Sequence, residues 1–227
     1  MPQSLINVGD AQLPYDLHAP ERCRGLVVFV HGSGSSRHSP RNRHVASALQ
    51  RAGFATLLFD LLLEDEEADR RAVFDIDLLT GRLLKVLAWV HRTYPDLRVG
   101  LFGASTGAAA ALMAAAAPES AVSAIVSRGG RPDLAGPALG VVGAPTLLIV
   151  GGADTAVLVL NRDAAAHMRC EHEVHIVPGA THLFEEPGTL DAVVDLARAW
   201  FERHLTDGDR PNVAGPTAGR AAPSSRR

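Results

Sequence analysis

The sequence predicts an α/β protein with a mostly parallel central sheet covered by helices on both faces. Two observations lead to this fold class. Short apolar runs alternate with segments of helical periodicity, and the runs end at Gly, Asp or Ser, as strands buried on both faces do. With 227 residues, 47% of them hydrophobic, the chain can bury one sizeable core. We therefore expect one domain over residues 1–205.

The apolar runs predict the strands in chain order. Two N-terminal pieces, residues 4–9 and 12–19, are expected at the edge of the sheet, because Pro14 cannot donate to a ladder. The inner strands are expected within residues 24–32, 54–60, 97–103, 123–130 and 144–154, and a sixth run at 171–180 resembles them.

Helices are expected between these runs and after the last one. One apolar face comprises Ile76, Leu79, Leu83, Val86 and Val90. A second comprises Leu190, Val193, Ala197 and Trp200, with Asp191, Asp195, Arg198 and Glu202 opposite. Residues 206–227 are rich in Gly, Pro and Ser without apolar periodicity, which predicts a disordered C-terminal tail.

Charge and cysteine content exclude several classes of protein. The net charge is −3 and no basic stripe appears, so nucleic acid is not an expected partner. Cys23 and Cys170 lack the spacing of a zinc site or a disulfide framework, which favours a reducing compartment. No export signal or long apolar span is visible, so we expect a cytoplasmic protein without membrane contact, a monomer or a homodimer.

The stretch Gly103-Ala104-Ser105-Thr106-Gly107 lies between an apolar run and an alanine-rich segment. A G-x-S-x-G sequence at a strand end lets the chain reverse sharply into a helix and exposes the serine hydroxyl. The serine then lies at the helix N-terminus, where developing negative charge is favoured. Alone, the motif also fits a serine that only caps the helix.

A nucleophilic serine needs a histidine base and a carboxylate that orients the base. Asp154 follows an apolar run and two glycines, and His182 follows the last run. The order Ser, Asp, His with each residue after a strand is that of a hydrolase built on an open parallel sheet. The separate alternatives are that Asp154 caps a helix and that His182 is an ordinary loop residue, with Asp60 or Asp133 as substitute acids.

An oxyanion hole needs two N–H donors. Thr106 follows the serine and is expected to supply one. The other is expected from the loop after the first inner strand, with Ser33 as first choice and Gly34 as second or as a substrate contact. His31 is interpreted as a hydrogen-bonded scaffold residue.

The segments HGSGS, GASTG, GGAD and GATHLF resemble the α/β-hydrolase family over about residues 5 to 205, and the lidless chain looks like its dienelactone-hydrolase-like members. The resemblance implies a three-layer α/β-hydrolase fold with no large lid. It further implies hydrolysis of a small ester or lactone through an acyl-serine, with no cofactor. Dienelactone hydrolases proper carry a cysteine nucleophile, so Ser105 moves the expectation toward general carboxylic esters.

Two other functions remain open. The glycine loop before His38, together with Asp60, loosely resembles a dinucleotide site, but Arg37 occupies the position of the third glycine. A hydrolase-like binding or regulatory protein with an idle triad fits the sequence as well.

Arg128 ends an inner strand and is predicted to bind an anionic group of the substrate. The alternatives are that it pairs with a structural acid such as Asp133 or that it caps a neighbouring helix. The acidic run at residues 64–71 is interpreted as a solvated loop or helix start, so no metal site is predicted. Phe184 fits either a pocket wall or packing beneath its loop.

Overall fold

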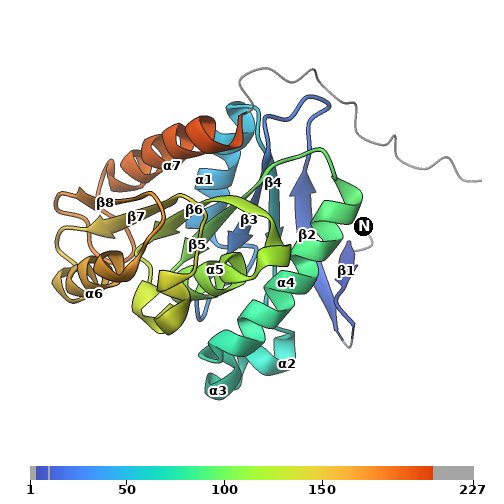
Figure 1. The fold of residues 1–227 in the computed structure, drawn as a ribbon, viewed down its shortest axis with the longest axis horizontal. Coiled ribbons are helices and arrows are strands. Elements are labelled where there is room, and N and C mark those ends of the chain that lie inside the picture. Colours follow the sequence, from blue (N-terminus) through green and yellow to red (C-terminus); the bar gives the residue numbers. More distant parts are fainter. Residues whose placement is uncertain (1–3, 10, 207–227) are drawn as a thin grey trace, which may run out of the picture.

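The computed structural model describes residues 4–9 and 11–206 and shows one eight-stranded sheet between two layers of helices (Figure 1). The strand order is β1-β2-β4-β3-β5-β6-β7-β8. The strands are β1 (Leu5–Asn7), β2 (Gln12–His18), β3 (Leu26–Val30), β4 (Ala55–Phe59), β5 (Val99–Ala104), β6 (Val122–Arg128), β7 (Thr146–Gly151) and β8 (His172–Val177).

The strands from β3 to β8 are all parallel, as the apolar runs predicted. β1 and β2 form the antiparallel edge expected at the N-terminus. Pro14 lies opposite Leu5 on β1, where the pairing of β2 with β4 has stopped, and its carbonyl accepts the Asp60 N–H. β8 alternates half-buried and exposed residues because it is the opposite edge of the sheet.

Two apolar clusters fill the two sides of the sheet. α1 (Pro40–Arg51) and α7 (Thr189–Leu205) cover one face, where Phe29 packs on Phe102 with ring centroids 5.0 Å apart. α4 (Ile76–Thr93), α5 (Thr106–Ala116) and α6 (Thr155–His167) cover the other. This arrangement is the predicted three-layer fold.

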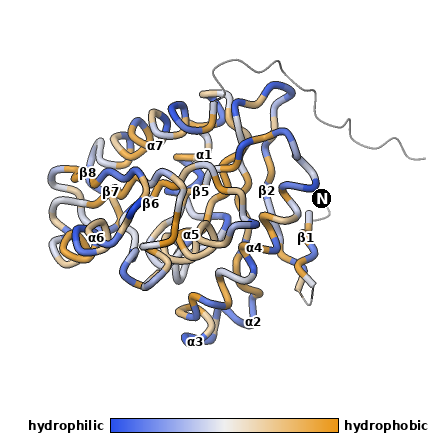
Figure 2. Tube along the Cα trace, in the orientation of Figure 1, coloured by the Kyte–Doolittle hydropathy of each residue, from blue (hydrophilic) through white to orange (hydrophobic). Residues whose placement is uncertain are grey.

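The two predicted amphipathic helices are α4 and α7, and both alternate hydrophobic and hydrophilic segments in Figure 2. Most of the apolar residues expected to face the sheet are buried, whereas Ile76 and Leu190 at the first turns are half-buried. The helices α1 and α6 had no predicted apolar face. α1 begins instead at a local capping sequence, in which the Ser39 hydroxyl accepts the Asn42 N–H and proline occupies the first turn.

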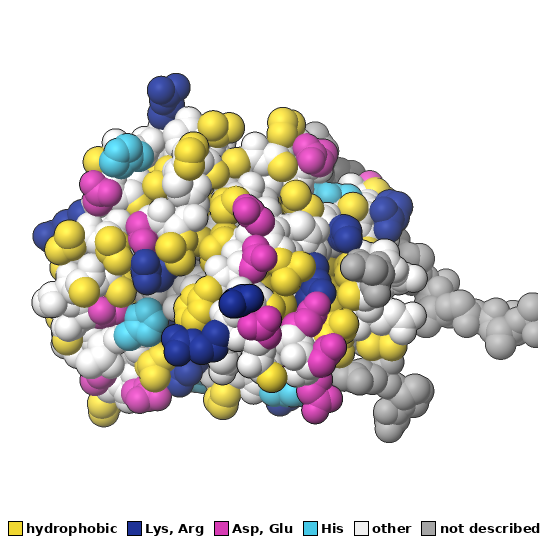
Figure 3. All heavy atoms as spheres, turned by 90° about the horizontal axis from the view of Figure 1, so that it is seen from below, with side chains coloured by type: hydrophobic (Ala, Val, Ile, Leu, Met, Phe, Trp, Pro, Cys, Tyr) yellow, Lys and Arg dark blue, Asp and Glu magenta, His cyan; other side chains and the backbone are white. Residues whose placement is uncertain are grey.

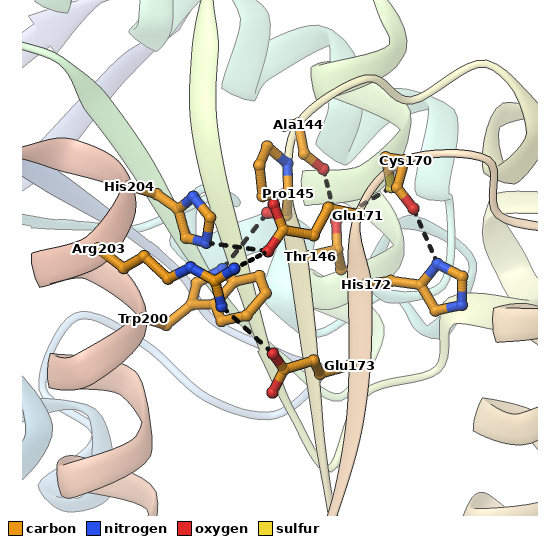
Figure 4. A network of polar contacts seen from close by, with 10 residues as sticks. All are labelled: Ala144, Pro145, Thr146, Cys170, Glu171, His172, Glu173, Trp200, Arg203 and His204. Carbon is orange, nitrogen blue, oxygen red and sulfur yellow. Dashed lines mark hydrogen bonds and ion pairs between the residues drawn. The ribbon is translucent and has the colours of Figure 1, made fainter.

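The last turns of α7 are attached to the amino ends of β7 and β8 (Figure 4). Arg203 pairs with Glu171 at 2.7 Å, and Trp200 donates to the Pro145 carbonyl at 3.4 Å. These two contacts anchor α7, the helix that follows the His182 loop.

Short helices occupy the connections at the carboxyl ends of β4 and β6. The acidic run forms the helix α2 (Glu64–Glu67) and the start of α3 (Arg70–Val73), and a 3-10 segment, η2 (Pro132–Gly140), lies between β6 and β7. A shorter 3-10 turn, η1 (Pro118–Ser120), precedes β6. In the described chain no large lid is inserted, as predicted. None of the helices in that part of the chain is long and apolar enough to cross a membrane. The predicted tail after Thr206 lies outside the described residues.

Candidate active site

Ser105 occupies the turn between β5 and α5 in a strained conformation. Its φ is 51° and its ψ −123°, a region that side-chain-bearing residues rarely adopt. Such strain costs on the order of 1–3 kcal/mol and persists only where the surroundings enforce it. The Ser105 side chain makes no capping hydrogen bond to α5, which disfavours the simple cap interpretation.

The neighbouring glycines are required by close packing. A Cβ on Gly107 would lie 2.2 Å from the Val30 carbonyl oxygen, and one on Gly103 would lie 2.6 Å from the Ala108 Cα. A Cβ on Gly32 would lie 2.8 Å from the Ser105 Cβ. Side chains at these three positions would push β3, β5 and α5 apart, so the glycines hold Ser105 against the loop after β3.

Asp154 and His182 meet across the ends of β7 and β8. The His182 Nδ1 lies 2.7 Å from the Asp154 Oδ2, and the Asp154 side chain is 14% exposed. Asp154 is the N-cap residue of α6, yet its side chain accepts no hydrogen bond from the helix. A carboxylate on Nδ1 keeps the proton on that nitrogen and leaves Nε2 free to act as a base.

The loop that carries His182 is braced from within and from below. Glu186 accepts hydrogen bonds from the Thr181 N–H and hydroxyl, at 3.1 and 2.6 Å. Phe184, with φ 56°, is 2% exposed and belongs to the core on the α1 and α7 side. Phe184 therefore packs beneath the loop.

The segment after β6 contacts both Ser105 and His182. The Arg131 N–H donates to the Ser105 carbonyl at 3.0 Å. A Cβ on Gly129 would lie 3.0 Å from the His182 carbonyl oxygen and 3.6 Å from its Nδ1. Among the described residues no hydrogen bond joins the Ser105 hydroxyl to the His182 ring. Hydrogen bonds of this kind often tighten only when substrate binds.

The predicted oxyanion donors lie next to each other. The Ser33 N–H donates to the Thr106 hydroxyl at 2.9 Å, so in this structure it is already paired. A substrate oxygen would have to replace that hydroxyl as the acceptor. Gly34 adopts a left-handed conformation, φ 65°, with open space beside its Cα.

His31 is a scaffold residue. Its Nδ1 lies 3.0 Å from the Gly32 carbonyl oxygen, and its Nε2 accepts the Leu61 N–H at 3.0 Å. This pattern requires a neutral ring with the proton on Nδ1, and burial lowers the pKa of His31 below its usual 6.5. The imidazole therefore joins the ends of β3 and β4.

Asp60, the acid that a dinucleotide site would use, has a protein partner. It accepts the Arg37 backbone N–H at 2.6 Å and also pairs with the Arg37 guanidinium. Arg37 thus folds back onto the end of β4, which argues against a ribose-binding role for this carboxylate.

A pocket of about 220 Å³ opens beside the Ser33 loop. Its polar wall is the run Gly32–Ser36 and its apolar floor comprises Leu61, Leu62, Val73 and Leu79. Glu67 also borders it, and burial is the main cause that raises the pKa of this carboxyl group. Because Gly32 contacts Ser105, the pocket adjoins the serine.

Arg128 is 6% exposed and has no carboxylate partner among the described residues. Asp133, the predicted alternative partner, instead accepts the Nε and Nη2 of Arg131, both at 2.8 Å. The pairing of Arg128 with Asp133 is therefore wrong, because the backbone bends at Gly129, with φ 51°, and Arg131 takes Asp133 as its partner.

Asn161 is a site residue that the sequence analysis missed. It lies on α6 at 0% exposure, and its Nδ2 donates to the Gly130 carbonyl at 3.0 Å and to the Val157 carbonyl at 2.8 Å. Asn161 thus ties the turn beside His182 to the helix after Asp154. The sequence signal that could have identified Asn161 was a polar amide on the buried face of a helix.

Figure 3, a view of the molecule from below, shows acidic and basic side chains interspersed on this face. The acidic run contributes Glu66, which pairs with Arg82 at 2.5 Å. The described residues contain no cluster of potential metal ligands.

Comparison with known proteins identifies the family. A model described as the alpha/beta hydrolase fold matches residues 25–144, about half of the chain. The chain belongs to the α/β-hydrolase family. A solved dienelactone hydrolase from Anabaena variabilis is 51% identical to this α/β-hydrolase, with a TM-score of 0.86 over 90% of this chain and 97% of that one. The predicted dienelactone-hydrolase-like assignment is thereby confirmed.

A structure from Xanthomonas campestris, described as an a/b serine hydrolase without lid, shares the fold at 22% identity. Its TM-score is 0.73, over 92% of this chain and 96% of that one.

This α/β-hydrolase is also 62% identical, over 88% of its length, to a protein of Mycobacterium tuberculosis named as a putative phosphoribosyl transferase. The match covers 46% of that protein, so the chain spans about half the length of this curated relative. The activity in that name is assigned to the whole, longer mycobacterial protein.

Proposed function

We propose that the chain is a serine hydrolase that cleaves small carboxylic esters or lactones through an acyl-serine. Ser105 is the nucleophile, His182 the general base and acid, and Asp154 the residue that orients the base. The observation that carries the proposal is the 2.7 Å contact between His182 Nδ1 and Asp154, whose carboxylate caps nothing on its own helix.

The first half of the reaction is acyl transfer to the enzyme. As the Ser105 Oγ attacks the substrate carbonyl, its proton passes to His182 Nε2. The resulting oxyanion is stabilised by N–H groups of Ser33 and Thr106 at the positive end of α5. His182 then returns the proton to the departing alkoxide, so the C–O bond breaks and the acyl group remains on Ser105.

The second half releases the acyl group. His182 accepts a proton from water while the water oxygen attacks the acyl carbonyl, and the tetrahedral intermediate collapses with the proton returned to Ser105. The products are a carboxylic acid and an alcohol, joined in one molecule when the substrate is a lactone. No step requires a cofactor.

The pocket beside Ser33 supports a small substrate. At about 220 Å³, with a floor of aliphatic side chains and a wall of serine-rich backbone, it fits a short acyl or alcohol group. Fatty-acid chains would exceed this space. We therefore propose short-chain esters and small lactones as substrates.

The proposal is tested with an ester and lactone panel on the wild type beside Ser105→Ala, His182→Ala and Asp154→Asn. The first two variants should lose about 10³-fold or more in kcat while still folding, since they remove the nucleophile or the base. Asp154→Asn should lose somewhat less, because its side chain does not touch the substrate. Full activity in the serine or histidine variant would refute the triad.

A fluorophosphonate probe separates this proposal from the other two functions. Labelling of the wild type but not of Ser105→Ala is expected, because only an activated serine reacts. An unlabelled, folded wild type would favour an idle site or a nucleotide-binding module.

A further inference from the structure

Arg128 is a buried guanidinium without a counter-charge among the described residues. The residue is 6% exposed, and its Nε is fully enclosed without a hydrogen-bond partner. Its guanidinium carbon lies 5.9 Å from the Phe184 ring centroid. Such a ring contact stabilises a cation only modestly and leaves the enclosed Nε–H without an acceptor. A buried charge in this state is costly unless a ligand completes it.

A second arginine contacts the residue that follows Phe184 in the chain. Arg41, on the first turn of α1, pairs with Glu185 at 3.1 Å, and its own Nε is also enclosed without a partner. Burial and then the positive charge of Arg41 lower the pKa of Arg128 to about 10. Because Phe184 and Glu185 are consecutive residues, the two guanidinium groups that contact them approach the same stretch of the His182 loop, where one anion would be attracted by both positive charges.

The pair lies beside the reacting groups. Arg128 accepts the Ser105 N–H on its carbonyl at 3.4 Å, and the adjacent Gly129 packs against His182. Phe184 and Glu185, which contact the two arginines, follow His182 closely in the sequence. None of these residues borders the pocket lined by the Ser33 loop, so the arginines are a separate feature beside Ser105.

We propose that Arg128 and Arg41 form a subsite for a phosphoryl group carried by the ester substrate. This inference rests on the proposed hydrolase function and names its substrate class. A planar carboxylate matches the fork of one guanidinium, whereas the tetrahedral phosphoryl group has enough terminal oxygens to accept from two arginines on separate elements. The N-terminus of the 12-residue helix α1 adds a favourable dipole for phosphate.

The kinetic test compares three esters of equal size that differ in one remote group: phosphate, carboxylate or hydroxyl. Arg128→Gln and Arg41→Gln should each raise KM for the phosphate ester at least about tenfold more than KM for the hydroxyl ester, and more than for the carboxylate ester. Arg128→Lys, which keeps the charge but loses the fork, should fall between them and the wild type. Arg43→Gln, an exposed position on the same helix, is the matched control and should change no ratio.

A binding test does not depend on catalysis. A non-hydrolysable ether analogue of the phosphate ester should bind Ser105→Ala by calorimetry, and adding Arg128→Gln should weaken this binding about tenfold or more. Two outcomes would overturn the subsite and leave the hydrolase intact. One is ester turnover in which the arginine variants change KM equally for all three esters. The other is analogue binding that is equally tight with and without the Arg128 side chain. Equal KM increases for the phosphate and carboxylate esters would overturn the phosphoryl assignment. Arg128-dependent analogue binding without turnover of any ester would refute the hydrolase and retain the subsite.

Discussion

At the scale of single residues, the hydrogen bonds that a polar side chain makes determine its role. Asp154 and Ser105 both stand at helix N-termini, where Asp and Ser usually cap. Neither side chain caps here. His31 shows the reverse case, because both ring nitrogens are used by backbone groups and none remains for chemistry.

The buried His31 predicts a pH dependence of stability. Burial lowers its pKa in the folded state below 6.5, so the unfolded chain binds more protons in the window below that value. Its contribution to stability is present above pH 6.5 and is lost as the pH falls toward the folded-state pKa. Urea unfolding measures the free energy of unfolding at pH about 7.5 and about 5.5. Between these pH values, His31→Gln should lose less of this free energy than the wild type.

The matched control is His38→Gln, because His38 is exposed in the loop just before α1. This variant should keep the wild-type difference between the two pH values. An identical pH difference in all three proteins would contradict the assignment of the dependence to His31.

At the scale of elements, the β5–α5 turn depends on glycines, because neighbouring backbone leaves no room for a Cβ atom. Gly107 contacts the Val30 carbonyl, which lets α5 begin against β3. At Gly81, in the interior of α4, an added Cβ would have no neighbouring atom within 4 Å, so this glycine plays no such part. Adding a methyl group is therefore expected to lower the stability of the protein at Gly107 and to raise it at Gly81.

Gly107→Ala should destabilise the protein by about 2–3 kcal/mol and abolish ester turnover, since the methyl group meets backbone and forces the elbow open. Gly81→Ala should stabilise by about 0.5–1 kcal/mol, because alanine is the better helix former. Urea denaturation and ester turnover of both variants check the pair. A neutral Gly107→Ala would show that the elbow tolerates displacement.

At the scale of the whole molecule, the candidate triad is distributed over one sheet. Ser105, Asp154 and His182 follow β5, β7 and β8, and the helices on both faces support those strands. α7 holds the His182 loop from one side through its anchored final turns. The site therefore depends on the strands from β5 to the β8 edge of the sheet.

If residues 1–205 form one cooperative unit, the site and the fold should be lost together in urea. Fluorophosphonate labelling of Ser105, tryptophan fluorescence and far-UV circular dichroism should give coincident transitions. Loss of labelling at a clearly lower urea concentration than the other two signals would reveal a site that opens before the sheet unfolds.

The sequence by itself determined the parallel strands, the two amphipathic helices and the glycine-lined turn at Ser105, because each is encoded by neighbours within one segment. Only the tertiary structure decided which partner each polar group takes. Asp154 meets a histidine 28 residues away, and the Ser33 N–H meets a hydroxyl 73 residues away. Asp133 pairs with Arg131, and Arg128 packs against the Phe184 ring instead. Such pairings depend on how distant strand ends converge, for which local periodicity carries no information.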